Sequence, residues 1–366
     1  MRPLRFPAAI LIVCALLTAC SNQAREERSG PAGAQRGLNG PNASSANLML
    51  VGAGSTFDYP FFSRAFFEYN KLHPNVAVNY QSIGSGGGIR QFSSRTVDFG
   101  ATDVPMSAKE LAAIPKDRPV IQIPIALGGV VIAFNIPDGP THLNLTPSLV
   151  ADIFLGKITD WSDPKIARVN GGAAQKPLRI TVVHRADGSG TTYVCTDYLS
   201  AVSPEWKNSV GKGKSVNWSA PSSVGAKGNE GVAGQIRNTP GAIGYIELAY
   251  ALQNDIQYAA VGNAAGKFVL PSFGSIAAAA AAKKNVSPSD FSIVNAPGDQ
   301  AYPIAGFSWV LLYQRYPDAQ KASALRDLFH WLLSDGQQLA KSVNYVPLPP
   351  AVTAPALSTV AKLGKT

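Results

Sequence analysis

The sequence has 366 residues, of which 46% are hydrophobic and 15% are charged. This composition is globular, and roughly 150 residues per domain predicts about two domains. The formal net charge is +9, but no run of Lys and Arg occurs, so binding to nucleic acid is not indicated. Two interpretations of the positive charge stay open: it steers small anions toward a cleft, or it only keeps the protein soluble.

The N-terminus is typical of a secretory signal. Arg2 and Arg5 precede a nearly uniform apolar stretch at 6–19, which is shorter than the roughly 20 residues of a membrane-spanning helix. The letters LTAC, which end at Cys20, resemble the lipobox of bacterial lipoproteins. That resemblance implies cleavage of a signal peptide at 1–19 and lipidation of Cys20, unless the cysteine is a coincidence in an ordinary signal. No later segment of the sequence is long and apolar enough to span a membrane.

Cysteine usage is consistent with a lipoprotein. Cys14 lies in the signal and Cys20 would carry lipid, so Cys195 is left as the only free thiol and no intramolecular disulfide is possible. We expect Cys195 to be a small buried side chain rather than a catalytic nucleophile.

The segment 20–47 is expected to be the lipidated cysteine followed by a flexible tether. Its Gly, Pro, Ser, Asn and charged residues include almost no large apolar side chain, so it cannot form a core. A tether of this length spans roughly 28 Å.

Short apolar runs alternate with helical patterns from Leu48 onward. The expected strands are 48–51, 76–80, 97–100, 130–136, 178–183 and 242–246. The expected helices are one with Phe62, Ala65, Phe66 and Tyr69 on one face, then 149–154, 193–199, 277–284 and 319–333. This alternation predicts the α/β class with mostly parallel sheets.

Three loops that follow predicted strands are the candidates for chemistry: Gly54–Phe57, Gly84–Gly88 and Arg185–Thr191. Ligands of open α/β sheets bind at the carboxyl ends of strands, where the next helix presents free N–H groups. All three loops are rich in Gly and carry hydroxyls, and Arg185 is their only cation. Backbone amides, hydroxyls and one guanidinium predict a cage for a small oxyanion, although any one such loop is commonly structural.

Competing motifs fail on spacing. Gly-Lys-Ser at 213–215 lacks the leading Gly and the preceding strand of a P-loop, and the dinucleotide-like start at Gly52 has Phe57 at its third Gly position. Neither Ser85 nor Ser189 has the surroundings of a hydrolase nucleophile. The four His residues are far apart, without the spacing of a zinc site. We therefore expect no catalytic residue, no metal and no cofactor.

Several segments together resemble the periplasmic phosphate-binding protein of the high-affinity phosphate ABC importer. The resemblance covers essentially the whole body from about Leu48 onward. The matching segments are GAGSTF at 52–57, YQSIGSGGG at 80–88, VDFGATD at 97–103, GGVV at 128–131, LGKITDW at 155–161, RADGSGT at 185–191 and PGAIGY at 240–245. The lipobox and tether depart from the soluble members of this family and match its lipoprotein members.

The resemblance implies a set of phosphate ligands: Thr56 and Phe57 with a hydroxyl and backbone amides, Ser85, Asp103, Arg185, Ser189, Gly190 and Thr191. Asp103 would accept a proton from phosphate, Arg185 would make the single charged contact, and Asp187 would hold Arg185 in place. The family often has Ala at the position of Ser55 and Ser at that of Gly86. Neither difference removes an expected donor, although Gly86 could loosen the second loop.

The implied fold is the type II periplasmic-binding-protein fold, with two α/β domains, a ligand cleft between them and a two-strand hinge. The two crossings are expected near 126–136 and 295–304. Domain I would then comprise 48–130 plus 300–366, and domain II would comprise 131–299. Closure by hinge motion around the ligand is the expected switch.

The resemblance also implies a receptor rather than an enzyme. It would bind inorganic phosphate as a monomer and deliver it to the membrane permease subunits of a phosphate ABC importer. It would be lipid-anchored in the cell envelope, facing the periplasm or the cell exterior.

Three alternatives stay open. A phosphatase-like enzyme on the same fold would need a nucleophile with a base, or a metal. A receptor for another oxyanion, such as sulfate or molybdate, is disfavoured by Asp103, because at neutral pH phosphate still carries a proton to donate and sulfate does not. A further signalling or adhesion role is compatible with any of these.

Overall fold

The computed structural model describes residues 48–172 and 175–364. Within them, one large sheet and a small three-stranded sheet form the framework. The large sheet has the order β2 (Val76–Ser82), β1 (Leu48–Gly54), β3 (Phe99–Thr102), β12 (Ala305–Tyr313), β4 (Val120–Phe134), β8 (Ala242–Glu247), β6 (Thr181–Arg185) and β7 (Ser223–Ala226), with β9 (Gln257–Tyr258) also paired to β4. The small sheet has the order β11 (Phe268–Val269), β10 (Ala260–Gly262) and β5 (Asn144–Leu145).

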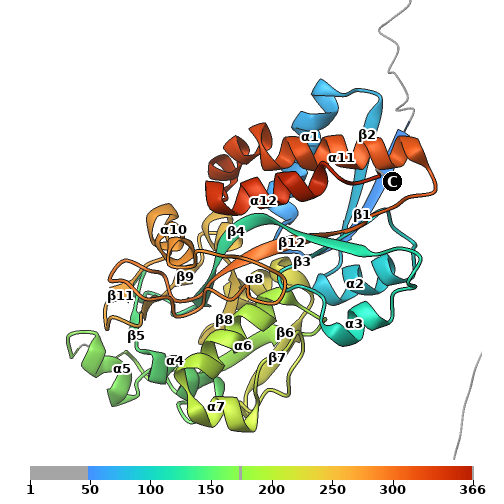
Figure 1. The fold of residues 1–366 in the computed structure, drawn as a ribbon. Coiled ribbons are helices and arrows are strands. Elements are labelled where there is room, and N and C mark those ends of the chain that lie inside the picture. The colour runs from blue at the N-terminus through green and yellow to red at the C-terminus, as the bar shows by residue number, and fades with distance from the viewer. Residues whose placement is uncertain (1–47, 173–174, 365–366) are drawn as a thin grey trace, which may run out of the picture. The chain divides into compact units, whose positions relative to one another are not determined.

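Helices pack around both halves of the large sheet (Figure 1). Along the first half lie α1 (Tyr59–Leu72), α2 (Ser85–Ser93), α3 (Ala108–Ala112), α11 (Ala319–Leu333), the 3₁₀ helix η1 (Asp335–Val343) and α12 (Pro350–Val360). Along the second half lie α4 (Pro147–Phe154), α5 (Pro164–Val169), α6 (Gly190–Val202), α7 (Pro204–Ser209), α8 (Gly228–Asn238), α9 (Leu248–Gln253) and α10 (Phe273–Ala281). The prediction of an α/β fold is therefore confirmed.

The long strand β4 connects the two halves of the large sheet. Its residues 120–129 pair with β12, and its residues 130–134 pair with β8. The N–H of Val130 donates to the carbonyl of Ile304 over 2.8 Å, so the chain leading into β12 lies beside the same point. The change of partner falls inside the predicted first crossing at 126–136. The exact domain boundaries stay a prediction.

The expectation of mostly parallel sheets is wrong at the centre of the large sheet. The outer strands pair in parallel, β1 with β2 and β3, and β6 with β7 and β8. The central strands β12 and β4 pair with their neighbours in antiparallel fashion. The reason is that β4 and β12 connect the two halves in opposite directions, which the βαβ pattern of either half does not reveal.

The strand β4 begins at Val120 rather than near residue 130 as predicted. Gln122 and Pro124 interrupt the apolar run in its first part, and proline has no N–H for a sheet ladder. The pairing with β12 accommodates this with a register shift, because Ser308 pairs with Ala126 and Trp309 pairs with Pro124, which leaves Ile125 of β4 as the extra residue. Such a β-bulge bends a strand and re-aims a side chain.

Cys195 lies in the core, as predicted. It is a free cysteine with no exposed surface, and burial raises the pKa of its thiol. A thiol that stays protonated is a poor nucleophile, which agrees with a packing role.

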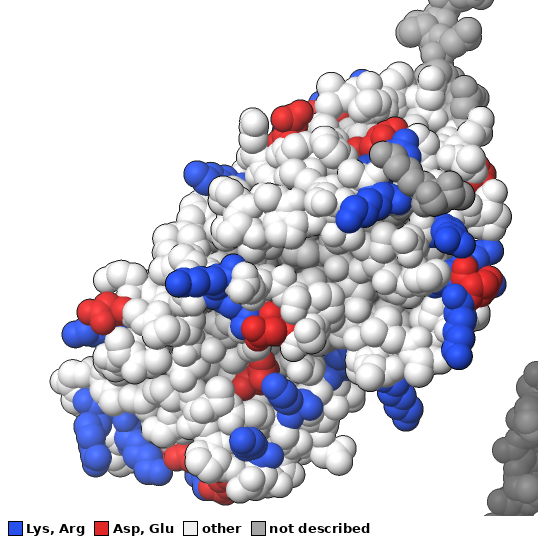
Figure 2. All heavy atoms as spheres, viewed as in Figure 1, with Lys and Arg blue, Asp and Glu red and all other residues white. Residues whose placement is uncertain are grey.

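The surface charges and the lengths of the helices bear on nucleic-acid binding and on membrane crossing. On the face shown in Figure 2, Lys and Arg are scattered among Asp and Glu rather than gathered into one patch. Within residues 48–172 and 175–364, no helix combines the length and the apolar character that crossing a bilayer requires.

Candidate anion-binding site

The three predicted loops meet beside the point where β4 changes partner. The Ser85 hydroxyl oxygen accepts the N–H of Asp103 at 3.2 Å and the N–H of Gly190 at 3.1 Å. The N–H of Gly86 donates to the carbonyl of Gly188 over 2.8 Å. These bonds tie loops after β2 and β3 to the loop after β6, so residues from both halves of the sheet form one cage.

All of the predicted ligands are buried in this cage, and they come from both sides of β4. Buried polar side chains are expected to have hydrogen-bond partners, so each unpaired group here is informative. The set comprises Thr56, Phe57, Ser85, Asp103, Arg185, Ser189, Gly190 and Thr191.

Two glycines permit the close approach of these loops. A Cβ atom on Gly190 would lie 2.5 Å from Asp103 Oδ2, so no other residue fits there without moving the carboxylate. Gly84 has φ +81°, a left-handed conformation that favours glycine, and a Cβ atom on it would lie 2.1 Å from Asp187 Oδ2. Gly84 and Gly190, which the sequence places in the predicted loops, are therefore needed for the loops to contact each other.

Arg185 is the buried cation of the cage. Its side chain is 1% exposed, and Nε and Nη2 donate to the two carboxylate oxygens of Asp187 over 2.8 and 2.5 Å. Burial acts to raise the pKa of Asp187, but hydrogen bonds and charge from Arg185 outweigh it and the pKa is lowered. Asp187 thus stays ionised and fixes the guanidinium plane, as the resemblance implied.

One nitrogen of Arg185 has no partner. Nη1 is buried and donates to nothing among the residues that the structure describes. A buried guanidinium N–H without an acceptor is costly, because it loses its hydrogen bonds to water. Its position in the cage indicates a ligand that supplies the acceptor.

Asp103 is buried at 2% exposure. Its Oδ1 accepts hydrogen bonds from the hydroxyls of Ser55 and of Ser308, the latter at 2.8 Å. Burial raises the pKa of Asp103 to about 6, against the lowering effect of these two bonds, of the Arg185 charge and of Ser85. Because both hydroxyls bind Oδ1, Oδ2 is the oxygen that faces Gly190 and is left for a ligand.

Asn229 orients two predicted hydroxyl ligands. Its Nδ2 donates to Thr56 Oγ1 at 2.8 Å and to Thr191 Oγ1 at 3.1 Å, and its backbone N–H also donates to Thr56 Oγ1 at 3.1 Å. Since both threonine oxygens accept from Asn229, their own protons are free to point toward an anion. Tyr250 holds the same loop by donating to the carbonyl of Thr56 at 2.6 Å.

Ser189 and Phe57 are already engaged in local bonds. The hydroxyl of Ser189 accepts the N–H of Thr192 at 3.0 Å and so caps α6, which leaves its proton available. The N–H of Phe57 donates to Ser55 Oγ at 2.9 Å. An anion contact from the Phe57 amide therefore requires that this bond be shared or broken.

Comparisons with known proteins agree with this geometry. A family model described as a PBP superfamily domain matches residues 29–336. Phosphate-binding protein PstS of Xylella fastidiosa strain 9a5c is 42% identical over 349 residues, which covers 94% of each chain. The protein of the same name from Pasteurella multocida strain Pm70 is 44% identical over 306 residues, 83% of this chain and 87% of that one.

The chain belongs to this family, the PstS proteins of the PBP superfamily.

Solved structures of phosphate-binding proteins share the fold. One from Stenotrophomonas maltophilia superposes with a TM-score of 0.63 at 19% identity, covering 85% of this chain and 93% of that one. The two-domain type II fold that the sequence predicted is that of this family.

Five residues of the site were not predicted from the sequence: Ser55 as a donor, Asp58, Asn229, Glu247 and Ser308. Asp58 adjoins the first loop, so its position alone was a usable signal. Asn229 lies in a glycine-rich segment at 225–231 where a strand ends, and Glu247 follows the matching segment at 240–245, so both carried a usable signal. Ser308 lies within a strand and has no such motif beside it. Only the folded sheet brings it to the cage.

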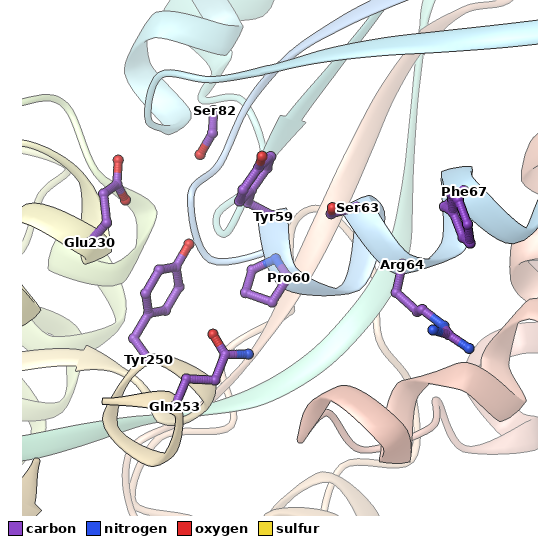
Figure 3. A pocket seen from close by; sticks show the side chains of 9 residues that line it. All are labelled: Tyr59, Pro60, Ser63, Arg64, Phe67, Ser82, Glu230, Tyr250 and Gln253. Atoms are coloured by element: carbon purple, nitrogen blue, oxygen red, sulfur yellow. The ribbon is translucent and has the colours of Figure 1, made fainter. Parts of the chain in front are cut away.

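A cavity of about 750 Å³ lies outside the cage, between the start of α1 and the helices α8 and α9 (Figure 3). Side chains that line it include Tyr59, Phe67, Glu230 and Tyr250. None of the predicted phosphate ligands lines it. One of its lining residues, Tyr250, contacts the cage through its hydroxyl, which reaches the backbone of the first loop.

The raised pKa of Asp103 predicts that the folded protein loses stability as this carboxyl ionises with rising pH. The folded-state pKa of about 6 lies above the value of about 3.9 for an unfolded Asp. The stabilising contribution of protonated Asp103 is therefore full below about pH 4 and is lost as pH rises through about 6.

Asp103→Asn keeps an acceptor for Ser55 and Ser308 and stays neutral. We expect this variant to gain up to about 3 kcal/mol of unfolding free energy over wild type at pH 8, and about half of that at pH 5.

Urea denaturation of phosphate-free protein at the two pH values measures this difference. Asp117→Asn, at a carboxylate that is 63% exposed, is the matched control and should show no such trend. An Asp103→Asn variant whose gain is the same at both pH values would contradict the assignment of a buried, titrating carboxyl.

Proposed function

We propose that the protein binds one inorganic phosphate ion in the cage of the three loops and delivers it to the permease subunits of a phosphate ABC importer. The observation that carries the proposal is the buried Arg185, whose Nη1 has no acceptor among the described residues. A phosphate oxygen would supply that acceptor through a charge-assisted hydrogen bond. The relatives that cover most of this chain are named phosphate-binding proteins.

The remaining ligands would surround the anion with donors. Thr56 and Thr191 have hydroxyl protons left over after accepting from Asn229, and Ser189 has one left over after capping α6. Gly190 begins a helix of 13 residues, whose first N–H groups favour an anion. The ligand residues are proposed on this geometry and on the motifs that match the family.

Asp103 would give the site its preference for phosphate. A carboxylate beside an anion is unfavourable unless the ligand brings a proton for it to accept. Phosphate at neutral pH carries one or two protons, whereas sulfate carries none. The Oδ2 oxygen that faces Gly190 is the proposed acceptor of that proton.

The prediction that the chain is not an enzyme is confirmed by its family, whose members are named as binding proteins. The alternatives of a phosphatase-like enzyme and of a receptor for another oxyanion have no specific observation in their favour.

We further propose that the protein acts in the cell envelope as a lipid-anchored monomer. The basis is the lipobox-like motif that ends at Cys20 and the expected tether at 20–47, which both lie outside the described residues. A tethered receptor stays close to the permease that it serves. The tether would let the body reach the permease and then move away.

Lipidation predicts a mature N-terminus at Cys20 that carries acyl chains. Mass spectrometry of protein extracted from the membrane fraction measures this directly, and Cys20→Ala should leave the protein unprocessed or released. An unmodified N-terminus at another residue would rule out the anchor.

Arg185→Ala is expected to weaken phosphate binding by about 30-fold or more. The physical reason is that truncating one partner of a buried, hydrogen-bonded charge pair costs about 2–5 kcal/mol. Titration calorimetry on phosphate-free protein measures the change. Arg237→Ala, at an exposed arginine on α8, is the control and should bind as wild type does. A folded Arg185→Ala variant that binds phosphate with unchanged affinity would show that the anion lies elsewhere.

The role of Asp103 predicts strong discrimination. Sites built around a ligand's donor reject analogues that lack it by about 10⁴–10⁵. We expect wild type to prefer phosphate over sulfate strongly, to bind arsenate nearly as well as phosphate, and to lose much of the discrimination in Asp103→Asn, whose amide can also donate. Competition binding at fixed pH and ionic strength is the test. Equal binding of sulfate and phosphate by wild type, or full discrimination in Asp103→Asn, would refute this account of specificity.

A further inference from the structure

Ser308 connects the proposed proton acceptor to a second buried carboxyl group. It lies in β12 opposite the point where β4 carries one extra residue, Ile125, and the register shifts, and it has no exposed surface. Its Oγ is 2.6 Å from Asp58 Oδ2 and 2.8 Å from Asp103 Oδ1. A single hydroxyl therefore bridges two carboxyl groups.

The hydrogen bonds of Ser308 favour a neutral form for one of these carboxyls, because its Oγ also lies 3.2 Å from the carbonyl of Thr102 and so has three acceptors around it. A serine hydroxyl has one proton and can donate to one oxygen at a time. Two ionised carboxylates on either side of it would leave one of them without a donor. Two like charges this close also disfavour double ionisation. The short contacts on both sides are satisfied only if one carboxyl brings its own proton and donates it to Ser308.

Asp58 is the group whose surroundings favour the neutral form. It is fully buried, and its Oδ1 has no hydrogen-bond partner among the described residues. Burial raises the pKa of Asp58 well above its usual range, the Asp103 charge raises it further, and only the Ser308 bond lowers it. Asp103 has instead the Ser55 hydroxyl and the Arg185 charge to favour its ionised form.

The titratable groups of the described residues whose charges act on Asp58 are acidic side chains. The titratable groups whose charges interact with it, besides Asp103, are Tyr80 of β2, Glu247 of β8, Tyr250 of α9 and Tyr345 after η1. Burial raises the pKa of Glu247 well above its usual range, so this carboxyl is also favoured as the neutral acid. The cation of the cage, Arg185, acts on Asp103.

We propose that Asp58 is a neutral carboxylic acid that donates its proton to Ser308 and so turns the Ser308 hydroxyl onto Asp103. Asp58 is then a positioning residue, and Asp103 is kept as the carboxylate that accepts the proton of the ligand. This inference rests on the proposed function of phosphate binding. Its consequence is that the Asp58–Ser308 pair sets the pH below which phosphate and sulfate are no longer well discriminated.

Sulfate binding as a function of pH reports the state of Asp103. Sulfate stays fully ionised between pH 5 and 8.5, so a change in its binding reflects the protein. As pH falls through about 6, the pKa of Asp103, the protonated carboxyl can donate to sulfate and binding strengthens. We propose measuring the midpoint of this rise by calorimetry for wild type, Ser308→Ala and Asp58→Asn, with phosphate binding followed in parallel.

The two variants are expected to differ in the midpoint of sulfate binding. Ser308→Ala removes a donor from Asp103, so the midpoint should move upward by about one pH unit or more. Asp58→Asn replaces a neutral donor with another neutral donor of the same shape, so the midpoint should stay where it is. If Asp58→Asn moves the midpoint downward, Asp58 was a negative charge and the proposal is wrong. An unshifted midpoint in Ser308→Ala also overturns it.

A measurement on wild type keeps the test independent of how the variants fold. In phosphate-free protein with ¹³C at the aspartate carboxyl carbons, NMR at pH 8 should show one aspartate with the chemical shift of a protonated acid. Spectra in which every aspartate is ionised at pH 8 would contradict the proposal. Failure of the proposed function is seen separately, as wild type that binds no phosphate at any pH.

Discussion

The balance of charge inside the cage determines whether an anion can bind there, and the positions of the surrounding side chains depend on it. Asp58, Asp103 and Glu247 are buried around one guanidinium, that of Arg185, which is already paired with Asp187. If all four carboxyls were ionised, the site would be strongly negative and an anion would be repelled. An anion is accommodated only when protons are present at defined oxygens. The Ser308 hydroxyl between Asp58 and Asp103, and the Ser55 hydroxyl on Asp103, would determine where these protons lie.

The same cage requires both halves of the sheet. Ser85 and Asp103 follow strands of the first half, and Arg185 and Gly190 belong to the second, yet they are joined by hydrogen bonds such as that from Gly190 N–H to Ser85 Oγ. The described arrangement is thus a closed one, which excludes water and strengthens each polar contact. Entry and release of a ligand must break these bonds. The crossing of β4 between its two partner strands is the natural place for that hinge motion.

Much of the fold and part of the site could be predicted from the sequence, because those features are local. Alternating apolar strands and amphipathic helices predicted the α/β class, and the loops at Gly54, Gly84 and Arg185 follow strands as expected. The antiparallel centre of the sheet was not predicted, since pairing across distant segments leaves no local pattern. For the same reason Ser308 was missed, although it lies opposite the bulge of β4 and between two carboxyls. The burial of the Asp58 carboxyl depends on packing from both halves, which composition cannot reveal.

The central claim is that Asp103 accepts a proton from a phosphate ion held by Arg185. Neutron diffraction from crystals of the phosphate complex grown in heavy water tests it most directly. We expect the anion to contact Arg185 Nη1 and to place a deuterium between one of its oxygens and Asp103 Oδ2, with the Ser55 and Ser308 hydroxyls pointing at Oδ1. An anion bound outside the cage, or an anion oxygen that faces Asp103 with no deuterium between them, would contradict the account.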